Sequence, residues 1–297
     1  MTTATKNQIL DPGELRLLET LRLAPRRTFS GRVRGERLSR QKGISIEFAD
    51  YREYVPGDDL RHLDWSILAR LDRPTIRTYR DEDDLAVYLA LDISSSMDFG
   101  EPSKFSQAVR IAAAIGFIGL IGQDAVYPLT LGGREQRGIR PLRGRGSYRA
   151  LSDWLTGLQP DGDRGLAASL SRIATSGLLR PGLFVCITDG LDPAVFDSLR
   201  SLASRGHEIA LIQILSEIEL DPDLEGDLRL LDAETGSVVE VTAHAQTLRE
   251  YKSNLAAHCR SLEETATRIG GRFVPGRAGQ ALSEFVIHGL QGVELVH

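Results

Sequence analysis

The chain has 297 residues, of which 41% are hydrophobic and 26% are charged, and its formal net charge at pH 7 is -5. This length suits one large α/β domain with extensions, or two small domains. The negative net charge gives no global signal of nucleic-acid binding, because nucleic-acid-binding domains usually carry a clear basic excess.

The two cysteines, Cys186 and Cys259, both lie in segments of regular pattern. This argues against a disulfide framework and favours a reducing compartment. Residues 1–10 are polar and lack the apolar core of a signal peptide. The longest apolar run, 111–121, is shorter than the roughly 20 residues that a membrane span needs. We therefore expect a cytoplasmic protein with no membrane span.

Residues 1–25 are expected to form an N-terminal arm with one short helix, because leucines recur at helical spacing between residues 10 and 24. Residues 26–82 have a different composition, with thirteen Lys and Arg against eight Asp and Glu up to residue 80. Short extended stretches dominate there, so we expect a basic β-rich module. Its segment 51–65 is dense in charged and aromatic residues and contains a Pro-Gly-Asp turn signal.

From residue 83 to the C-terminus, strand-like and helix-like segments alternate, which predicts a doubly wound, mostly parallel α/β sheet with helices on both faces. The expected strands are 85–91, 125–131, 183–188, 208–215 and 272–275. The expected helices are 104–122, 147–158, 166–176, 194–204, 245–269 and 281–290. Two short strands around a turn at 232–236 predict a β-hairpin insertion at about 217–243.

Two carboxylates, Asp92 and Asp189, each follow an apolar strand. Ligands of open α/β sheets bind at the carboxyl ends of the strands, so both are expected to face one crevice. Ser94 and Ser96 follow Asp92 at alternate positions, and a loop of this spacing directs one carboxylate and two hydroxyls toward a single point. Such an all-oxygen set suits a hard cation such as Mg²⁺. The alternative is that Asp92 caps the next helix and the serines are turn residues.

The segment Leu89-Ala-Leu-Asp-Ile-Ser-Ser-Ser-Met97 resembles the metal-ion-dependent adhesion site of von Willebrand factor A domains. Ile187-Thr-Asp-Gly190 resembles the second acidic ligand strand of the same fold. Residues 51–70 closely resemble the hallmark of a bacterial family called domain of unknown function, family 58. Further similarity to that family extends over about residues 26–290 and includes the hairpin 228–241 and the helix segment 251–258.

The resemblance implies a von Willebrand factor A-like fold in which Asp92, Ser94 and Ser96 form the first ligand loop for Mg²⁺ or Mn²⁺. It implies that Asp189 is the distal aspartate, which in such sites often acts through a water.

The resemblance also implies a threonine in the loop before the helix that precedes the Asp189 strand, and Arg164 stands in that place. A guanidinium cannot ligate a cation and would repel one. Either Asp161 or Asp163 supplies an oxygen instead, or the site is metal-free and Arg164 pairs with one of the two strand-end aspartates. We expect weak metal binding or none.

A glycine-interleaved stretch, 134–149, is rich in arginine and contains a single acidic residue, Glu135. Its functional interpretation is a docking site for an acidic partner or a polyanion, and the alternative is a solvated loop. Aromatic side chains, which a nucleic-acid platform would interleave, are nearly missing from it, so no nucleic-acid partner is expected. The candidate partner-binding residues are Arg134, Arg137, Arg140, Arg143 and Arg145.

The sequence contains neither a phosphate-binding P-loop nor a nucleophile elbow, and cysteine and histidine never cluster at zinc spacing. An aspartyl-phosphate phosphatase would place an acid two residues after its nucleophile, where this chain has Ser94. We expect a non-catalytic protein–protein interaction or adaptor protein. The resemblance implies a MoxR-type AAA+ ATPase and a client protein as partners. A metal-dependent phosphatase-like hydrolase and a polyanion-binding module are the alternatives.

Overall fold

The computed structural model describes residues 9–27, 29, 47–55, 63–80, 85–135, 137–161, 165–176, 179–192, 195–233 and 236–297. The chain divides into two compact units. The larger unit comprises residues 1–27 and 85–297, and the smaller unit comprises residues 28–84.

The larger unit is built on a five-stranded parallel sheet with the strand order β4-β3-β5-β6-β9. Three central strands consist of buried residues throughout, as a parallel sheet covered on both faces requires. The strands are β3 (Ala86–Asp92), β4 (Ala125–Leu131), β5 (Leu183–Thr188), β6 (Glu208–Leu215) and β9 (Arg272–Arg277). The α/β class and the strands expected from the sequence are confirmed, and this sheet is parallel throughout.

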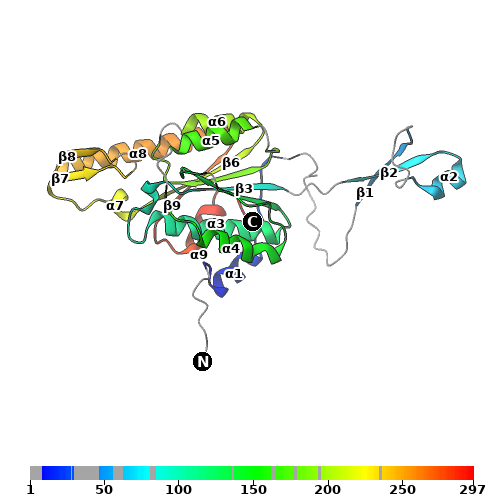
Figure 1. Ribbon diagram of the computed structural model, residues 1–297, viewed down its shortest axis with the longest axis horizontal. Coiled ribbons are helices and arrows are strands. Elements are labelled where there is room, and N and C mark those ends of the chain that lie inside the picture. The colour runs from blue at the N-terminus through cyan, green and yellow to red at the C-terminus, as the bar shows by residue number, and fades with distance from the viewer. Residues whose placement is uncertain are drawn as a thin grey trace, which may run out of the picture. The chain divides into compact units, whose positions relative to one another are not determined.

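Helices cover both faces of the sheet (Figure 1). On one face, α5 (Leu166–Ser176), α6 (Val195–Ser204) and α8 (Ala245–Arg268) pack on side chains such as Tyr88. On the other face lies α3 (Lys104–Ile121), with α4 (Tyr148–Thr156) packed against it. The shorter elements of this unit are η2 (Ser95–Asp98), η3 (Arg145–Ser147), α7 (Glu217–Leu220), α9 (Leu282–Glu284) and η4 (Phe285–Leu290). The single helix expected at 281–290 is instead one short α-turn followed by a π-helix.

The central helix α3 is apolar on nearly all sides because it is packed on nearly all sides. Among the described helices it alone is long and apolar enough to cross a membrane, with a mean hydropathy of 1.4, but 72% of it is buried within the protein. Two glycines permit its close packing. A Cβ added at Gly116 would lie 2.3 Å from Leu151 of α4, and one at Gly119 would lie 3.0 Å from Val126 of β4.

The N-terminal helix α1 (Pro12–Glu19) belongs to the larger unit, whereas the sequence suggested a separate arm over residues 1–25. Asp11 and Glu14 form a capping box at its start. Its Leu18 is fully buried, and Glu14 forms an ion pair with Arg110 of α3. Leu23 continues the attachment through a β-bridge to Val296.

The expected hairpin insertion is present as β7 (Gly226–Leu231) and β8 (Val238–Ala243), which pair antiparallel and are largely exposed. It precedes α8, so the hairpin and the long helix are continuous in the chain.

In the smaller unit, β1 (Glu47–Glu53) pairs antiparallel with β2 (Thr75–Arg80). Between them lies α2 (Trp65–Leu71), a helix that the sequence analysis did not predict. Asp64 is its N-cap and accepts hydrogen bonds from the backbone N–H groups of the next turn. The turn signal at 56–58 lies outside the described residues.

Candidate functional site

The two strand-end aspartates lie at the same edge of the sheet. Strands β3 and β5 are neighbours and run parallel, with Leu91 opposite Ile187. Asp92 therefore ends β3 beside Thr188, whose hydroxyl donates a 2.7 Å hydrogen bond to Oδ2 of Asp92. Asp189 follows directly, and both carboxylates are almost fully buried. The structure thus brings together the two acids that the sequence placed in one crevice.

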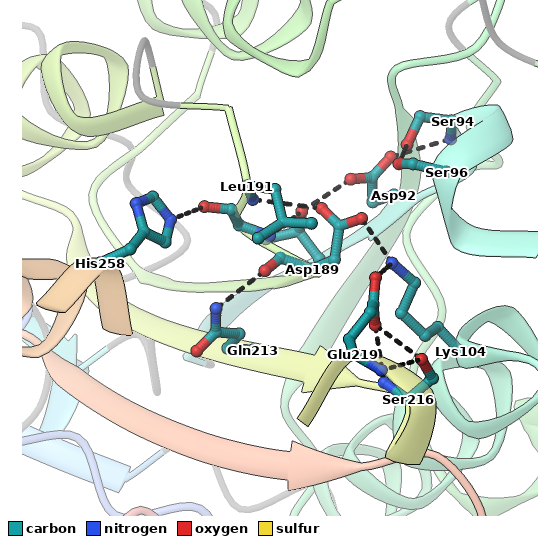
Figure 2. A network of polar contacts seen from close by, with 12 residues as sticks. Asp92, Ser94, Ser96, Lys104, Asp189, Leu191, Gln213, Ser216, Glu219 and His258 are labelled. Carbon is teal, nitrogen blue, oxygen red and sulfur yellow. Dashed lines mark hydrogen bonds and ion pairs between the residues drawn. The ribbon is translucent and has the colours of Figure 1, made fainter. Parts of the chain in front are cut away.

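The loop after β3 gathers the two serines around Asp92 (Figure 2). The backbone N–H of Ser94 donates to Oδ1 of Asp92 at 2.9 Å, and the hydroxyls of Ser94 and Ser96 lie 3.0 Å apart. Met97, which is fully buried, anchors the loop. Asp92 does not cap the next long helix, because Ser103 is the N-cap of α3. Asp92, Ser94 and Ser96 therefore form one polar cluster.

Asp92 carries an unfavourable charge in this setting. Its burial and, second, the nearby negative charge of Asp189 raise the pKa of Asp92 to about 7. Hydrogen bonds from Thr188 and Ser94 favour the ionised form but do not outweigh these effects. A buried pair of carboxylates of this kind is stabilised by a positive charge close by.

A positive charge that the sequence analysis missed is present at Lys104, the first residue of α3. Its side chain is 1% exposed, and its ammonium donates to Oδ2 of Asp189 at 2.9 Å and to Oε1 of Glu219 at 2.6 Å. Burial would lower the pKa of Lys104, but the negative charges of Asp189 and Glu219 outweigh it and raise the pKa overall. A lysine in the first turn of a helix is unfavourable for the helix dipole. Lys104 at the start of an apolar helix could therefore have indicated an acidic partner in the sequence.

Glu219 is held in place by its own turn of helix. The backbone N–H and the hydroxyl of Ser216 both donate to Oε2 of Glu219, at 2.7 and 2.9 Å. This capping box occupies one carboxylate oxygen and leaves the other, Oε1, to Lys104.

Helix α8 supports both acid-bearing segments from the outside. His258 Nε2 lies 2.7 Å from the backbone oxygen of Gly190, and the hydroxyl of Tyr251 donates to the backbone oxygen of Glu219 at 3.0 Å. From β6, the amide of Gln213 donates to the backbone oxygen of Asp189 at 2.9 Å. The two carboxylates that flank Lys104 therefore share one supporting helix.

Of the residues considered as substitutes for the expected threonine, Asp161 lies beside the site. Its backbone N–H donates to the oxygen of Ile93 at 3.1 Å, and Arg137 pairs with its Oδ2 at 3.0 Å. Its Oδ1 is buried and meets no hydrogen-bond partner within the described part of the chain. Asp163 and Arg164 lie outside the described residues, so the predicted role of Arg164 stays a prediction.

The arginine-rich stretch begins at the site and then follows the edge of the sheet. A Cβ added at Gly132 would lie 2.8 Å from Oδ1 of Asp92. Beyond it, residues 137–142 run back along the edge strand β4 through bridges at Gly138 and Leu142, so the backbone of this part is paired with the sheet. Its side chains reach solvent, and Arg145 forms an ion pair with Glu19. All five candidate partner-binding arginines are exposed, namely Arg134, Arg137, Arg140, Arg143 and Arg145.

The donor set at the strand ends can be compared with what a metal requires. Across the described ranges, no three Asp, Glu, His or Cys side chains cluster closely enough to hold an ion. The cluster offers the Asp92 carboxylate and two serine hydroxyls, with the buried Oδ1 of Asp161 nearby. Oxygen donors of these kinds fit Mg²⁺ or Mn²⁺. The second acid, Asp189, is already paired with Lys104.

Sequence comparison establishes the family. Residues 50–261 match the family model described as "Protein of unknown function DUF58". The uncharacterized protein Mb1516 of Mycobacterium bovis is 31% identical over 274 residues, which cover 89% of this chain and 85% of that protein. The chain belongs to the DUF58 family. A shorter match to this DUF58 chain, the uncharacterized protein MAV169 of Mycobacterium avium, is 36% identical over 118 residues, or 37% of the chain and 66% of that protein.

Three solved structures illustrate the structural likeness of the DUF58 chain. An aerotolerance-related membrane protein from Bacteroides fragilis has a TM-score of 0.43 and 19% identity, covering 71% of this chain and 96% of that one. BatB from Bacteroides thetaiotaomicron has a TM-score of 0.36 and 14% identity, covering 63% and 98%. The SpRpn10 VWA domain has a TM-score of 0.38 and 10% identity, covering 69% and 94%. Nothing about activity follows from likeness at this level.

Proposed function

We propose that this DUF58 protein is a non-catalytic adaptor that binds a protein partner at the carboxyl ends of β3 and β5. The supporting observation is the convergence of Asp92, Ser94, Ser96 and Asp189 at one edge of the sheet. Asp92, Ser94 and Ser96 would hold Mg²⁺ or Mn²⁺, with Asp161 as an added donor. A cation held in this way supplies an open coordination position for a carboxylate of the partner.

The surroundings of Asp92 favour binding over hydrolysis. Both of its carboxylate oxygens accept hydrogen bonds, one from Ser94 and one from Thr188. The residue two positions further on is a serine, so that position offers no acid to assist a leaving group. For this reason we prefer the adaptor to the phosphatase-like hydrolase.

The rim of the site favours an acidic partner. The exposed arginines of the 134–145 stretch begin two residues after Gly132, which abuts Asp92. Their charges would steer an acidic segment toward the strand ends and bind the residues that flank its carboxylate. We propose a MoxR-type AAA+ ATPase and a client protein as the partners, on the resemblance to the family alone. Polyanion binding by the same arginines is the second candidate.

The test is co-purification of a MoxR-type ATPase, co-expressed with the tagged full-length protein, in Mg²⁺ and in EDTA. We expect Asp92→Asn and Ser96→Ala to capture less ATPase than the wild type does. Capture by the wild type should fall partly in EDTA. The matched control is Asp153→Asn, because Asp153 is an exposed carboxylate on α4. Equal capture by all variants would show that the strand ends are not part of the interface. Turnover of p-nitrophenyl phosphate that Asp92→Asn abolishes would favour the hydrolase instead.

A further inference from the structure

The side chain of Lys104 joins two carboxylates that belong to different parts of the chain. Asp189 follows β5 and Glu219 lies in α7, and their oxygens are 2.9 and 2.6 Å from the ammonium. The side chains of the three residues are 1%, 6% and 13% exposed, in the order Lys104, Asp189, Glu219. Water therefore screens these charges little, so the attraction within each pair is stronger than at the surface, and loss of one partner leaves a costly buried charge.

Both carboxylates are fixed independently of Lys104. Glu219 is tied to Ser216 through its Oε2, and Asp189 accepts the backbone N–H of Leu191 on Oδ1 at 3.3 Å (Figure 2). The lysine has a flexible four-carbon stem. Of the three side chains, the ammonium is thus the one that can move without breaking a capping or backbone contact.

A divalent cation at the Asp92 cluster would be attracted by the charge of Asp189, because Asp189 directly follows Thr188, whose hydroxyl donates to Asp92 at 2.7 Å. An ammonium bonded to Asp189 neutralises that charge and repels a second cation. The two cations therefore compete for the negative charge of Asp189, and Glu219 offers the ammonium a second carboxylate.

We infer that Lys104 is the resident cation of the strand-end site, and that it shifts from Asp189 to Glu219 when a divalent cation binds beside Asp92. This inference rests on the proposed function, because it describes how the proposed metal-assisted binding site is neutralised when no divalent cation is bound. It gives Lys104, rather than Arg164, the task of setting metal affinity.

A double-substitution cycle tests this exchange. The probe is Mn²⁺ alone, titrated by calorimetry into full-length protein stripped with EDTA, using wild type, Lys104→Gln, Glu219→Gln and the double variant. We expect Lys104→Gln to bind Mn²⁺ about tenfold more tightly and Glu219→Gln about fivefold more weakly than the wild type. In the Lys104→Gln background, Glu219→Gln should change the affinity by no more than about twofold, because Glu219 acts through the ammonium.

Simple long-range attraction gives a different result. If Glu219 acted only through its own charge, Glu219→Gln would weaken Mn²⁺ binding by the same factor in both backgrounds. That outcome, or an unchanged affinity in Lys104→Gln, would overturn the exchange.

Because loss of Lys104 can unfold the protein, the wild type provides a second readout. The sequence has four lysines, so ¹⁵N-lysine labelling gives few side-chain signals to assign. We expect saturation with Mg²⁺ to shift the Nζ signal of Lys104 and to leave that of Lys252, a half-exposed lysine paired with Asp221, unchanged. An unmoved Lys104 signal would contradict the exchange.

The two proposals fail in distinguishable ways. If none of the proteins in the cycle binds Mn²⁺, the exchange is wrong, while capture of the ATPase still decides whether the strand ends bind a partner. If the cycle behaves as expected and capture is insensitive to Asp92→Asn, the exchange stands and the adaptor function fails.

Discussion

The ammonium of Lys104 lies 2.9 Å from Oδ2 of Asp189, and neither side chain has appreciable access to solvent. The pair joins the start of α3 to the end of β5, and Glu219 adds a second bond from α7. A charge buried without its partner costs much more than an exposed one, so the stability of the larger unit depends on Lys104.

Lys104→Met should lower the free energy of unfolding by about 3–5 kcal/mol in EDTA, because it leaves two buried carboxylates uncompensated. Urea denaturation followed by circular dichroism measures this. The control is Lys252→Met, whose half-exposed ion pair with Asp221 should be worth less than about 1 kcal/mol. Equal losses in the two variants would show that the buried pairs are not the stronger ones.

The raised pKa of Asp92 predicts that the stability of the protein depends on pH. Its pKa is raised from 3.8 to about 7 in the folded protein, so between these values the folded state holds a proton that the unfolded chain has released. The contribution of Asp92 is therefore fully present below about pH 4 and declines as pH rises through 7, by up to ~1 kcal/mol per pH unit.

Asp92→Asn removes this titration. In EDTA, the variant should gain stability relative to the wild type as pH rises from 4 to 7, measured by urea unfolding at each pH. Asp153→Asn, at an exposed carboxylate, should follow the wild-type curve. Parallel curves for wild type and Asp92→Asn would mean that Asp92 is ionised throughout this range.

Gly132→Ala should disturb the site directly. Gly132 has a φ of 74°, and an added Cβ would lie 2.8 Å from Oδ1 of Asp92. Gly236 has a φ of 69° but meets no described atom within 4 Å, so Gly236→Ala isolates the backbone strain. We expect about 1 kcal/mol of destabilisation for Gly236→Ala and at least about twice that for Gly132→Ala, by urea unfolding. Similar values would indicate that Asp92 moves aside easily.

The sequence was sufficient for β3 and β5 because each is a short apolar run, and for the meeting of Asp92 and Asp189 because parallel strands end at one edge. It did not give the partners of Lys104. Those partners lie 85 and 115 residues further along the chain, and no local pattern encodes a contact that depends on how α7 packs.

Other differences have local causes. The helix α2 has only 7 residues, which is shorter than the window over which apolar periodicity distinguishes a helix from a strand. For the arginine-rich stretch the sequence analysis considered a docking site or a solvated loop, and it did not predict the pairing of this stretch at Leu142 with the open backbone groups of β4, an edge strand.

His258 links α8 to the Asp189 segment through a 2.7 Å hydrogen bond to the backbone oxygen of Gly190. His258→Ala removes the imidazole that donates to the backbone oxygen of Gly190, so we expect a loss of about 1 kcal/mol in the free energy of unfolding. Hydrogen–deuterium exchange should increase at residues 189–192 and stay unchanged in the Asp92 loop, whose bonds come from Ser94 and Thr188.

The matched control is His244→Ala, at the N-cap of the same helix, where the imidazole accepts from the backbone N–H of Thr247 at 3.1 Å. It should loosen the first turn of α8 and leave residues 189–192 protected, because it removes a cap and not the link to Gly190. If both substitutions loosen residues 189–192 equally, α8 supports the segment through its general packing. If only His258→Ala does so, the hydrogen bond to Gly190 is what holds residues 189–192 in place.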